Sequence, residues 1–253
     1  MKVLGVIPAR YASARFPGKP LALIKGRSMI EHVYRGVGEH TELFDLVVAT
    51  DDQRIYDAVL AFGGKVIMTS DKHTSGTSRC IEVSQHYTDI DWIINVQGDE
   101  PLFNSKLLDE VIGLMKRDHK APIITMLRQI EHPEDAFNTN IVKCVFDRSG
   151  RALYFSRSPI PHVRQGHEGK YYQHLGIYAY KKEILSKLTE LEPTPLEALE
   201  SLEQLRWLEH GLSIQTGITE YRAHGVDVPE DIGYIERILD KKENHSNTDP
   251  LNE

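Results

Sequence analysis

The sequence has few cysteines and no long apolar run. Cys80 and Cys144 are the only two among 253 residues, and neither lies in a CxxC pair or a Cys/His cluster. This favours two buried thiols in a reducing compartment, although the count also allows one disulfide. The apolar run Val3–Ile7 ends at Pro8 and is too short for a signal-peptide core, and no stretch approaches the roughly 18 apolar residues that span a bilayer. We therefore expect a cytoplasmic globular protein with no membrane partner.

Positive charge is also scarce. Lys and Arg total 30 against 37 Asp and Glu, which gives a formal net charge of -7. A protein that coats nucleic acid or an anionic membrane carries the opposite balance, so we expect no nucleic-acid partner. Any phosphate that the protein binds must then be held by a local pocket.

Several familiar catalytic patterns are missing. The chain has no GxGxxG and no GxxxxGK[ST] loop, which disfavours a dinucleotide enzyme and a P-loop NTPase. Its 12 histidines form no HExxH and no zinc-ligand spacing. No GxSxG is present and neither cysteine lies beside a basic motif, so a covalent nucleophile is not supported.

What the first half does contain is an alternation of strand and helix signals. Capping residues Ser28, Asp52 and Asn104 precede three of the helical segments. The alternation is typical of βαβ units and predicts an α/β fold with a mostly parallel sheet. The strands are expected at residues 3–7, 46–50, 66–68 and 92–96, with helices at 28–38, 52–62, 78–88 and after 104.

From about residue 121 the pattern changes. We expect a β-rich subdomain packed on the sheet, not a separate tethered domain, so that residues 1–240 form one domain. The polar stretch 241–253 is expected to be a flexible tail. The elements expected here are a hairpin of 141–146 with 152–155, strands at 174–180 and 214–218, one helix over 196–210 and another over 230–239.

A basic loop, residues 8–20, follows the first strand directly. In an open α/β sheet the ligand crevice borders the carboxyl ends of the strands. Arg10, Arg15 and Lys19 supply positive charge there, and the small residues between them let backbone N–H groups approach a phosphate. The loop therefore predicts a triphosphate site. The alternative is a solvated basic loop that binds nothing.

Two further loops carry carboxylates. Asp99 follows the strand at 92–96 beside Gly98, a place suited to a divalent metal such as Mg²⁺, which takes one or two carboxylates together with substrate phosphates. The alternative is an ordinary exposed turn. Asp227 lies just before Pro229, where a helix begins; it could be a second metal ligand or a helix cap, and the sequence spacing does not bring it to Asp99.

The remaining candidates each have an equally plain structural interpretation. Residues 73–79 have small hydroxyl side chains suited to a nucleobase or ribose, or simply an N-cap. Arg157 and His174 lie on expected strands, where a lone histidine is more often structural. Glu203 and Gln204 would ordinarily form the solvated face of the helix expected at 196–210.

Eight blocks, in one order, carry a resemblance over nearly the whole chain. They resemble the CMP-KDO synthetase (3-deoxy-manno-octulosonate cytidylyltransferase) family. The PAR…PGKPL loop is shared with sialic-acid and other nonulosonate CMP synthetases, whereas ALYFSR, HLGIY and LEQLR favour KDO. The blocks are IPARYASARFPGKPL (7–21), VATDD (48–52), SGTSR (75–79), NVQGDEP (95–101), ALYFSR (152–157), HLGIYAY (174–180), LEQLRWLEHG (202–211) and VDVPED (226–231).

The resemblance implies a three-layer nucleotide-diphospho-sugar transferase-like α/β fold with a small inserted β-rich dimerisation subdomain, usually as a homodimer. It implies a nucleotide-binding half of about 1–120 and a sugar-binding and dimerisation half of about 121–240. The implied reaction transfers CMP from CTP to the anomeric hydroxyl at C2 of KDO with Mg²⁺, releases pyrophosphate and serves lipopolysaccharide synthesis.

The resemblance also implies roles for individual residues, with Arg10, Lys19, Asp99 and Asp227 as the catalytic set. Arg10 and Lys19 would bind the triphosphate with support from Arg15, and Asp99 and Asp227 would hold Mg²⁺. The nucleotide side would further include Ala9, Ser75, Gly76, Arg79 and Gln97, and the KDO side would consist of Arg157, His174, Tyr178, Glu203 and Gln204, with Arg157 as partner of the sugar carboxylate.

One departure and three alternatives stay open. The family usually has an acidic residue where this chain has Ser78, which weakens the assignment of Arg79 and could signal a modified sugar or a looser nucleotide choice. The acceptor could be 8-amino-KDO or sialic acid instead of KDO. The chain could also be a catalytically silent nucleotide-sugar binding protein.

Overall fold

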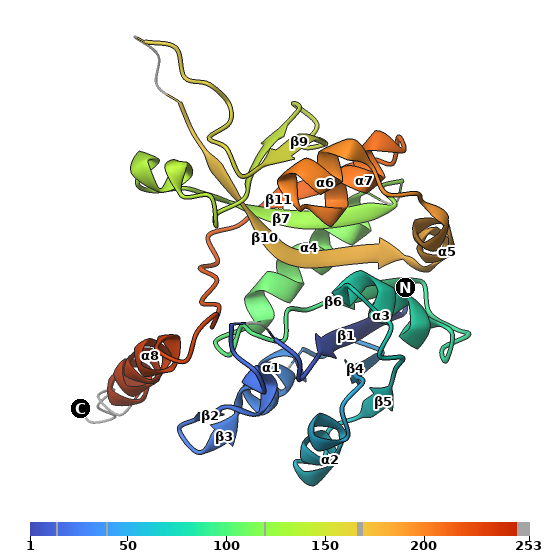
Figure 1. The fold of residues 1–253 in the computed structure, drawn as a ribbon, viewed down its shortest axis with the longest axis vertical. Helices are drawn as coiled ribbons and strands as arrows, with labels where there is room; N and C mark the ends of the chain where they lie inside the picture. Colours follow the sequence, from blue (N-terminus) through green and yellow to red (C-terminus); the bar gives the residue numbers. More distant parts are fainter. Residues whose placement is uncertain (14, 39, 119, 166–168, 247–253) are drawn as a thin grey trace, which may run out of the picture.

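The strands of the first half form one side of the central sheet (Figure 1). The computed structural model describes residues 1–13, 15–38, 40–118, 120–165 and 169–246. β1 pairs in parallel with β4 and β6, and β5 pairs in parallel with β4, which confirms the expected parallel sheet. The bounds are β1 (Val3–Ala9), β4 (Asp45–Thr50), β5 (Val66–Met68) and β6 (Trp92–Asn95).

Strands of the second half extend the same sheet rather than packing on its face. The order is β11-β7-β10-β6-β1-β4-β5, and β10 runs antiparallel to both β6 and β7. The expected hairpin forms from β8 and β9, with Gly150 at φ 82° in its turn, and it joins β10 through the pair Gln173 and Lys143. The bounds are β7 (Ile123–Gln129), β8 (Lys143–Phe146), β9 (Ala152–Ser156), β10 (Tyr172–Lys181) and β11 (Ile214–Ile218).

Helices cover both faces of the sheet and make three layers (Figure 1). Successive side chains of a strand point to opposite faces, so Val3 and Ile7 enter one apolar core while Leu4 and Val6 enter the other. The first core contains α1 (Met29–Gly38), α2 (Gln53–Ala61) and α4 (Ser105–Arg117). The second contains α3 (Gly76–Ser84), α5 (Lys182–Glu190) and α7 (Glu203–Glu209).

Side-chain caps fix where three of these helices begin. Asp52 and Asn104 accept hydrogen bonds from the backbone N–H groups of Arg54 and Lys106, as the sequence predicts. Helix α3 begins earlier than expected, at Gly76, because Ser75 caps it. Its first turn therefore lies at the edge of the sheet where strand β6 ends.

The single helix expected over 196–210 is wrong. The structure has two short helices, α6 (Pro195–Glu200) and α7, separated by Ser201 in the left-handed region at φ 52°. In a continuous helix the carbonyl of Glu200 would accept from residue 204. Here it accepts from Nε of Arg157 at 2.8 Å, while the Glu200 carboxylate binds Ser156 and the backbone of Arg157. Long-range contacts thus override the helical spacing of the leucines at 196, 199, 202, 205 and 208, which favours one continuous helix.

The last helix forms a third, smaller core beside the loop that follows β1. Ile235 of α8 (Asp231–Ser246) packs with Ile24, Met29, Leu102 and Val226. The helix continues past the expected end at 239 and through the beginning of the expected tail; residues 247–253 lie outside the described residues. The small elements near this core and after β7 are η1 (Lys19–Leu21), β2 (Leu23–Ile24), β3 (Arg27–Ser28) and η2 (Pro133–Phe137).

Two further expectations concern cysteine and membranes. Cys80 and Cys144 are both buried and form no disulfide, which confirms the thiol interpretation. Within the described ranges, no helix combines the length and apolar character needed to cross a membrane.

Strand β11 offers a matched test of this packing. Ile214 is fully buried and Ile218 is 53% exposed on the same strand. We expect Ile214→Ala to lower the free energy of unfolding by about 2–5 kcal/mol, because it removes buried methyl groups and leaves a cavity. Ile218→Ala should cost less than about 1 kcal/mol. Urea unfolding of both variants measures the difference, and equal losses would contradict the different burial of the two side chains.

Candidate active site

A cavity of about 520 Å³ lies where the loops after β1 and β6 meet α3, β10 and α7. The fold brings fourteen of the fifteen residues predicted from the sequence to its wall, and Arg157 is the exception. Those that line it are Ala9, Arg10, Arg15, Lys19, Ser75, Gly76, Arg79, Gln97, Asp99, His174, Tyr178, Glu203, Gln204 and Asp227.

The basic loop is shaped by a tight turn at Gly18. This residue has φ 72°, and its N–H donates to the carbonyl of Tyr11 at 2.9 Å. A Cβ at Gly18 would meet the Tyr11 ring at 3.0 Å, so glycine is required by both conformation and space. The turn directs Lys19 inward, whereas Arg10 and Arg15 stay exposed. The three cations of the loop thus share one cavity wall.

The two carboxylates that the sequence could not bring together lie in that cavity. The Val226 N–H donates to the carbonyl of Asp99 at 2.9 Å, which joins their loops. Lys19 Nζ donates to Asp99 Oδ2 at 2.7 Å, and Arg15 Nη2 donates to Asp227 Oδ1 at 2.8 Å. The alternative role of Asp227 as a helix cap is wrong, because α8 begins only at Asp231. The Asp231 carboxylate instead accepts hydrogen bonds from the backbone N–H groups of Asp227 and Val228.

Close backbone approach explains the glycine before Asp99. A Cβ at Gly98 would meet the carbonyl oxygen of Pro8 at 2.8 Å, so the two loops can touch only with glycine there. Glu100 is the residue after Asp99, and burial together with the charge of Asp99 raises its pKa to about 7. Glu100 accepts a hydrogen bond from the Tyr221 hydroxyl at 3.2 Å. Sequence reasoning missed this contact, since nothing local marks Tyr221.

Glu203 is not on a solvated helix face. Its carboxylate accepts hydrogen bonds from the hydroxyls of Ser75 at 3.1 Å and Thr77 at 2.9 Å. Burial raises its pKa above the usual range. The break before α7 places Glu203 in the first turn, where it faces α3 across the cavity. The sequence did not single out Thr77, although it lies within the segment 73–79 that was identified.

The wall formed by β10 and α7 holds polar atoms that lack protein partners. Within the part of the chain that the structure describes, the hydroxyl of Tyr178 and Nε2 of Gln204 are buried without a hydrogen-bond partner. Buried polar groups are normally paired, so both atoms are available to a bound molecule. Nearby, Gln97 Nε2 donates to the carbonyl of Gly176 at 2.7 Å, which fixes its side chain.

His174 is neutral in this environment. Loss of hydration on burial lowers the pKa of His174 to about 3. Its Nε2 lies 3.1 Å from the hydroxyl of Thr125, and its ring packs edge-on against Phe155. His174 therefore presents an uncharged imidazole to the cavity over the physiological range.

Arg157 lies away from the cavity. Its guanidinium donates to the carbonyls of Glu200 at 2.8 Å and Thr139 at 3.1 Å, in addition to a longer contact with Ser201. Arg79 does line the cavity, but Nη1 and Nη2 bond to Thr69 and Asp51. The guanidinium groups of Arg157 and Arg79 thus both bond to protein atoms, and these bonds do not indicate contact with a ligand.

Ser78 completes the cap of α3. Its hydroxyl donates to the carbonyl of Ser75 at 2.9 Å, and its N–H donates to the Ser75 hydroxyl at 3.2 Å. The two side chains form a reciprocal capping box. Ser78 is absent from the wall of the cavity, which is lined instead by its neighbours Thr77 and Arg79.

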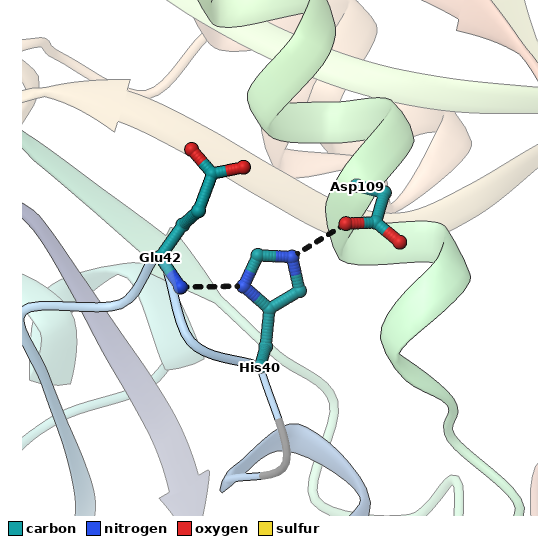
Figure 2. Close-up of side chains that lie close together, drawn as sticks. All are labelled: His40, Glu42 and Asp109. Carbon is teal, nitrogen blue, oxygen red and sulfur yellow. Dashed lines mark hydrogen bonds and ion pairs between the residues drawn. The ribbon is translucent and has the colours of Figure 1, made fainter.

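A second cluster of possible metal ligands lies outside the wall of this cavity. His40, Glu42 and Asp109 bring one ligand atom each within 4.8 Å of one another. Figure 2 shows that both ring nitrogens of His40 are engaged: Nδ1 accepts from the Glu42 N–H at 3.2 Å, and Nε2 contacts Asp109 at 2.9 Å. Nδ1 thus carries the lone pair and Nε2 the proton, so this geometry leaves no nitrogen lone pair for a metal.

A mostly parallel sheet with a basic loop after its first strand, carboxylates at the same edge and a buried polar wall defines an α/β nucleotide-binding protein. The comparisons refine this class. The cytidylyltransferase family model matches residues 4–214, and the chain belongs to that family.

Relatives cover almost the full length of the chain. A 3-deoxy-manno-octulosonate cytidylyltransferase of Thermodesulfovibrio yellowstonii is 46% identical over 94% of this chain and 98% of that protein. The enzyme of the same name from Cytophaga hutchinsonii is 45% identical over 92% of this chain and 95% of that protein. The solved structure of CMP:2-keto-3-deoxy-manno-octonic acid synthetase complexed with CTP is 40% identical, with a TM-score of 0.91 over 96% of this chain and 100% of that one.

The neutral His174 predicts a pH dependence of stability. Its folded pKa is depressed, so between about pH 6.5 and 3 the unfolded chain binds a proton that the folded chain does not. The contribution of His174 to the free energy of unfolding is therefore fully present above pH 6.5 and decreases as the pH falls below it. The wild type loses free energy of unfolding between pH 7.5 and 5.5, and we expect His174→Gln to make this loss smaller by about 1.4 kcal/mol. Urea unfolding measures it, with His162→Gln, an exposed site, as control; equal slopes in wild type and His174→Gln would contradict the assignment.

The cap at Ser78 predicts that this residue does not select the nucleotide. Ser78 does not line the cavity, and Asp at this position can also accept a hydrogen bond from the Ser75 N–H. We therefore expect Ser78→Asp to change the ratio of CTP to UTP turnover by less than about twofold. Turnover with each nucleotide in both proteins is the measurement. A tenfold change in the ratio would show that Ser78 acts on the nucleotide after all.

Proposed function

We propose that this chain transfers CMP from CTP to the anomeric hydroxyl of 3-deoxy-D-manno-octulosonate (KDO), releasing pyrophosphate, and that it supplies CMP-KDO for lipopolysaccharide synthesis. The observation that carries this is the single cavity, in which a basic loop, two carboxylates and a buried polar wall meet. Relatives at 45–46% identity over most of the chain are named for this reaction. The acceptors 8-amino-KDO and sialic acid and the silent-binder alternative are not favoured.

The triphosphate is assigned to the basic loop. Arg10, Arg15 and Lys19 give charge-assisted hydrogen bonds to phosphate oxygens, and Ala9 permits close backbone approach. The cytidine is assigned to the opposite wall, formed by Ser75, Gly76 and Gln97. Gly76 suits that role, because a Cβ there would lie 3.3 Å from Asn95 Nδ2 and 3.4 Å from Pro8.

KDO is assigned to the wall built by β10 and α7. The hydroxyl of Tyr178 and Nε2 of Gln204 have no hydrogen-bond partner in the part of the protein that the structure describes and can bind sugar hydroxyls. The carboxylate of Glu203 can accept hydrogen bonds from further sugar hydroxyls. The neutral ring of His174 adds a polar group without charge. Arg157 contributes by ending α6, and its guanidinium stays on backbone carbonyls.

The reaction needs positioning and charge neutralisation more than a covalent nucleophile. The C2 hydroxyl oxygen of KDO forms a bond to the α-phosphorus of CTP and loses its proton to water, and pyrophosphate leaves with the electron pair of the broken P–O bond. Lys19 and Arg10 neutralise charge that builds up on the phosphate oxygens. The walls fix the sugar hydroxyl and the phosphorus in one cavity, which removes most of the entropic cost of their encounter.

Mg²⁺ is proposed as the cofactor, held by Asp99 and Asp227. The donor set fits, because Mg²⁺ prefers carboxylate and phosphate oxygens and both side chains are partly exposed, at 33% and 55%. Each carboxylate is paired with a cation, Lys19 or Arg15, in the protein alone. When bound, the metal supplies further neutralisation of phosphate charge.

The proposal extends to the assembly and the location of the protein. Residues 1–240 are proposed to act as one domain, whose nucleotide half (1–120) and sugar and dimerisation half (121–240) both contribute to the cavity. A homodimer is also proposed, with Leu153 on β9, which is 57% exposed, as a candidate contact residue. A cytoplasmic location is supported by the two reduced thiols. Light scattering of wild type and Leu153→Glu tests the dimer.

The decisive experiment is pyrophosphate release with CTP, Mg²⁺ and KDO, run beside sialic acid and 8-amino-KDO. We expect turnover with KDO that is lost on chelation and restored by Mg²⁺. Asp99→Asn should reduce it by about a hundredfold or more, because one of two carboxylates loses its charge. Asp89→Asn, at an exposed carboxylate paired with Lys2, is the control and should retain activity.

Each other result has a definite meaning. Activity with another acid sugar but not with KDO would move the substrate and keep the chemistry. CTP binding without turnover on any sugar would support the silent-binder alternative. Full activity of Asp99→Asn would reject the metal assignment, provided that its thermal unfolding matches that of wild type.

A further inference from the structure

The guanidinium of Arg79 borders the cavity, but its bonds point away from it. The residue is 3% exposed. Nη2 donates to Asp51 Oδ2 at 2.6 Å, and Nη1 donates to the hydroxyl of Thr69 at 2.7 Å. Asp51 follows β4 directly and is not among the residues that line the cavity. Two of the three guanidinium nitrogens are therefore committed to the protein.

We propose that Asp51 is a positioning residue for the nucleotide: it holds Arg79, and Arg79 holds the segment 69–77 in place without contacting the nucleotide. The proposal rests on the proposed function, because it takes this wall of the cavity as the cytidine side. It assigns a role to a carboxylate outside the cavity. It also changes the role of Arg79, which would hold the segment 69–77 in place instead of contacting the nucleotide.

The segment 69–77 depends on such support because residues 69–75 connect β5 to α3 and only its last two residues belong to the helix. At one end, the N–H of Thr69 donates to the carbonyl of Thr50 at 2.8 Å, which ties it to the end of β4. In the middle, Glu82 of α3 accepts from the N–H of Ser70 at 3.0 Å and pairs with His73. Arg79 lies in α3 two residues beyond Thr77, and its side chain bonds to Thr69 at the other end of the segment. It also bonds to Asp51, which follows Thr50.

Charge makes Asp51 the critical partner. A buried guanidinium is tolerated only when it is paired, and removal of its carboxylate leaves an uncompensated charge. Arg79 would then relax toward the cavity and move the first turn of α3, including Ser75 and Gly76. A displacement of about 1 Å at binding groups can cost up to about a hundredfold. Asp51→Asn keeps the shape and removes the charge, so it isolates this effect.

The test measures CTP dissociation constants by calorimetry on the full chain, for wild type, Asp51→Asn, Arg79→Gln and the double variant. We expect each single variant to bind CTP about tenfold to a hundredfold more weakly. The double variant should bind no more than about threefold more weakly than the worse single variant, because both changes break one interaction. In turnover, KM for CTP should rise while kcat at saturating CTP stays within about threefold.

Strand β4 supplies a matched control at its other end. Asp45 pairs with Lys65 at 2.6 Å and its side chain is 17% exposed, against 2.6 Å and 20% for Asp51. It lies outside the cavity wall, so Asp45→Asn should leave CTP affinity within about twofold. Asp51→Glu keeps the charge and should fall between wild type and Asp51→Asn. Hydrogen exchange of the ligand-free protein should increase within 69–77 in Asp51→Asn and not in Asp45→Asn.

The outcomes separate this proposal from the proposed function. If Arg79→Gln loses CTP affinity while Asp51→Asn does not, or if the two losses add, Arg79 contacts the nucleotide directly and the proposal is overturned. If Asp51→Asn and Asp45→Asn weaken binding equally, Asp51 has no special role. If wild type itself does not bind CTP, the proposed function fails, and the assignment of Asp51 fails with it.

Discussion

The ammonium of Lys19 holds three loops of the cavity together. It donates to Asp99 Oδ2 at 2.7 Å and to the carbonyl of Val226 at 2.8 Å, and it reaches both from the turn at Gly18. Its side chain is only 15% exposed, so these bonds are shielded from water and salt. The pair of Arg15 and Asp227 is 63% and 55% exposed and contributes little to stability by comparison.

Cations and carboxylates are balanced within the cavity, although the whole chain has more acidic than basic residues. Three cations, Arg10, Arg15 and Lys19, lie in the single loop after β1 and line the cavity. In the protein alone, Lys19 and Arg15 are paired with Asp99 and Asp227, the carboxylates proposed to hold Mg²⁺. Binding of a metal by Asp99 and Asp227 would release Lys19 and Arg15 for phosphate oxygens. Lys19, Arg15 and the two carboxylates would therefore each have a partner of opposite charge both in the protein alone and with metal and triphosphate bound.

Local patterns were sufficient to predict the sheet but not the cavity. Continuous apolar runs marked the buried strands, and Asp52 and Asn104 marked helix starts, because both signals depend on neighbouring residues alone. The approach of Asp227 to Asp99 was left open by the sequence, since it depends on Val226 pairing with a loop more than a hundred residues away. Tyr221 and its bond to Glu100 were missed for the same reason.

The break between α6 and α7 shows how a distant residue can override a strong periodic signal. Leucines at helical spacing predict one helix, yet Leu199 is 81% exposed while Leu202 and Leu205 are buried, so the two halves face different surroundings. Arg157 takes the carbonyl that the continuous helix would need. Because α7 then begins at Glu203, the carboxylate meets Ser75 and Thr77 across the cavity. Arg157 thus influences the site through the place where a helix begins, and this effect cannot be read from either segment alone.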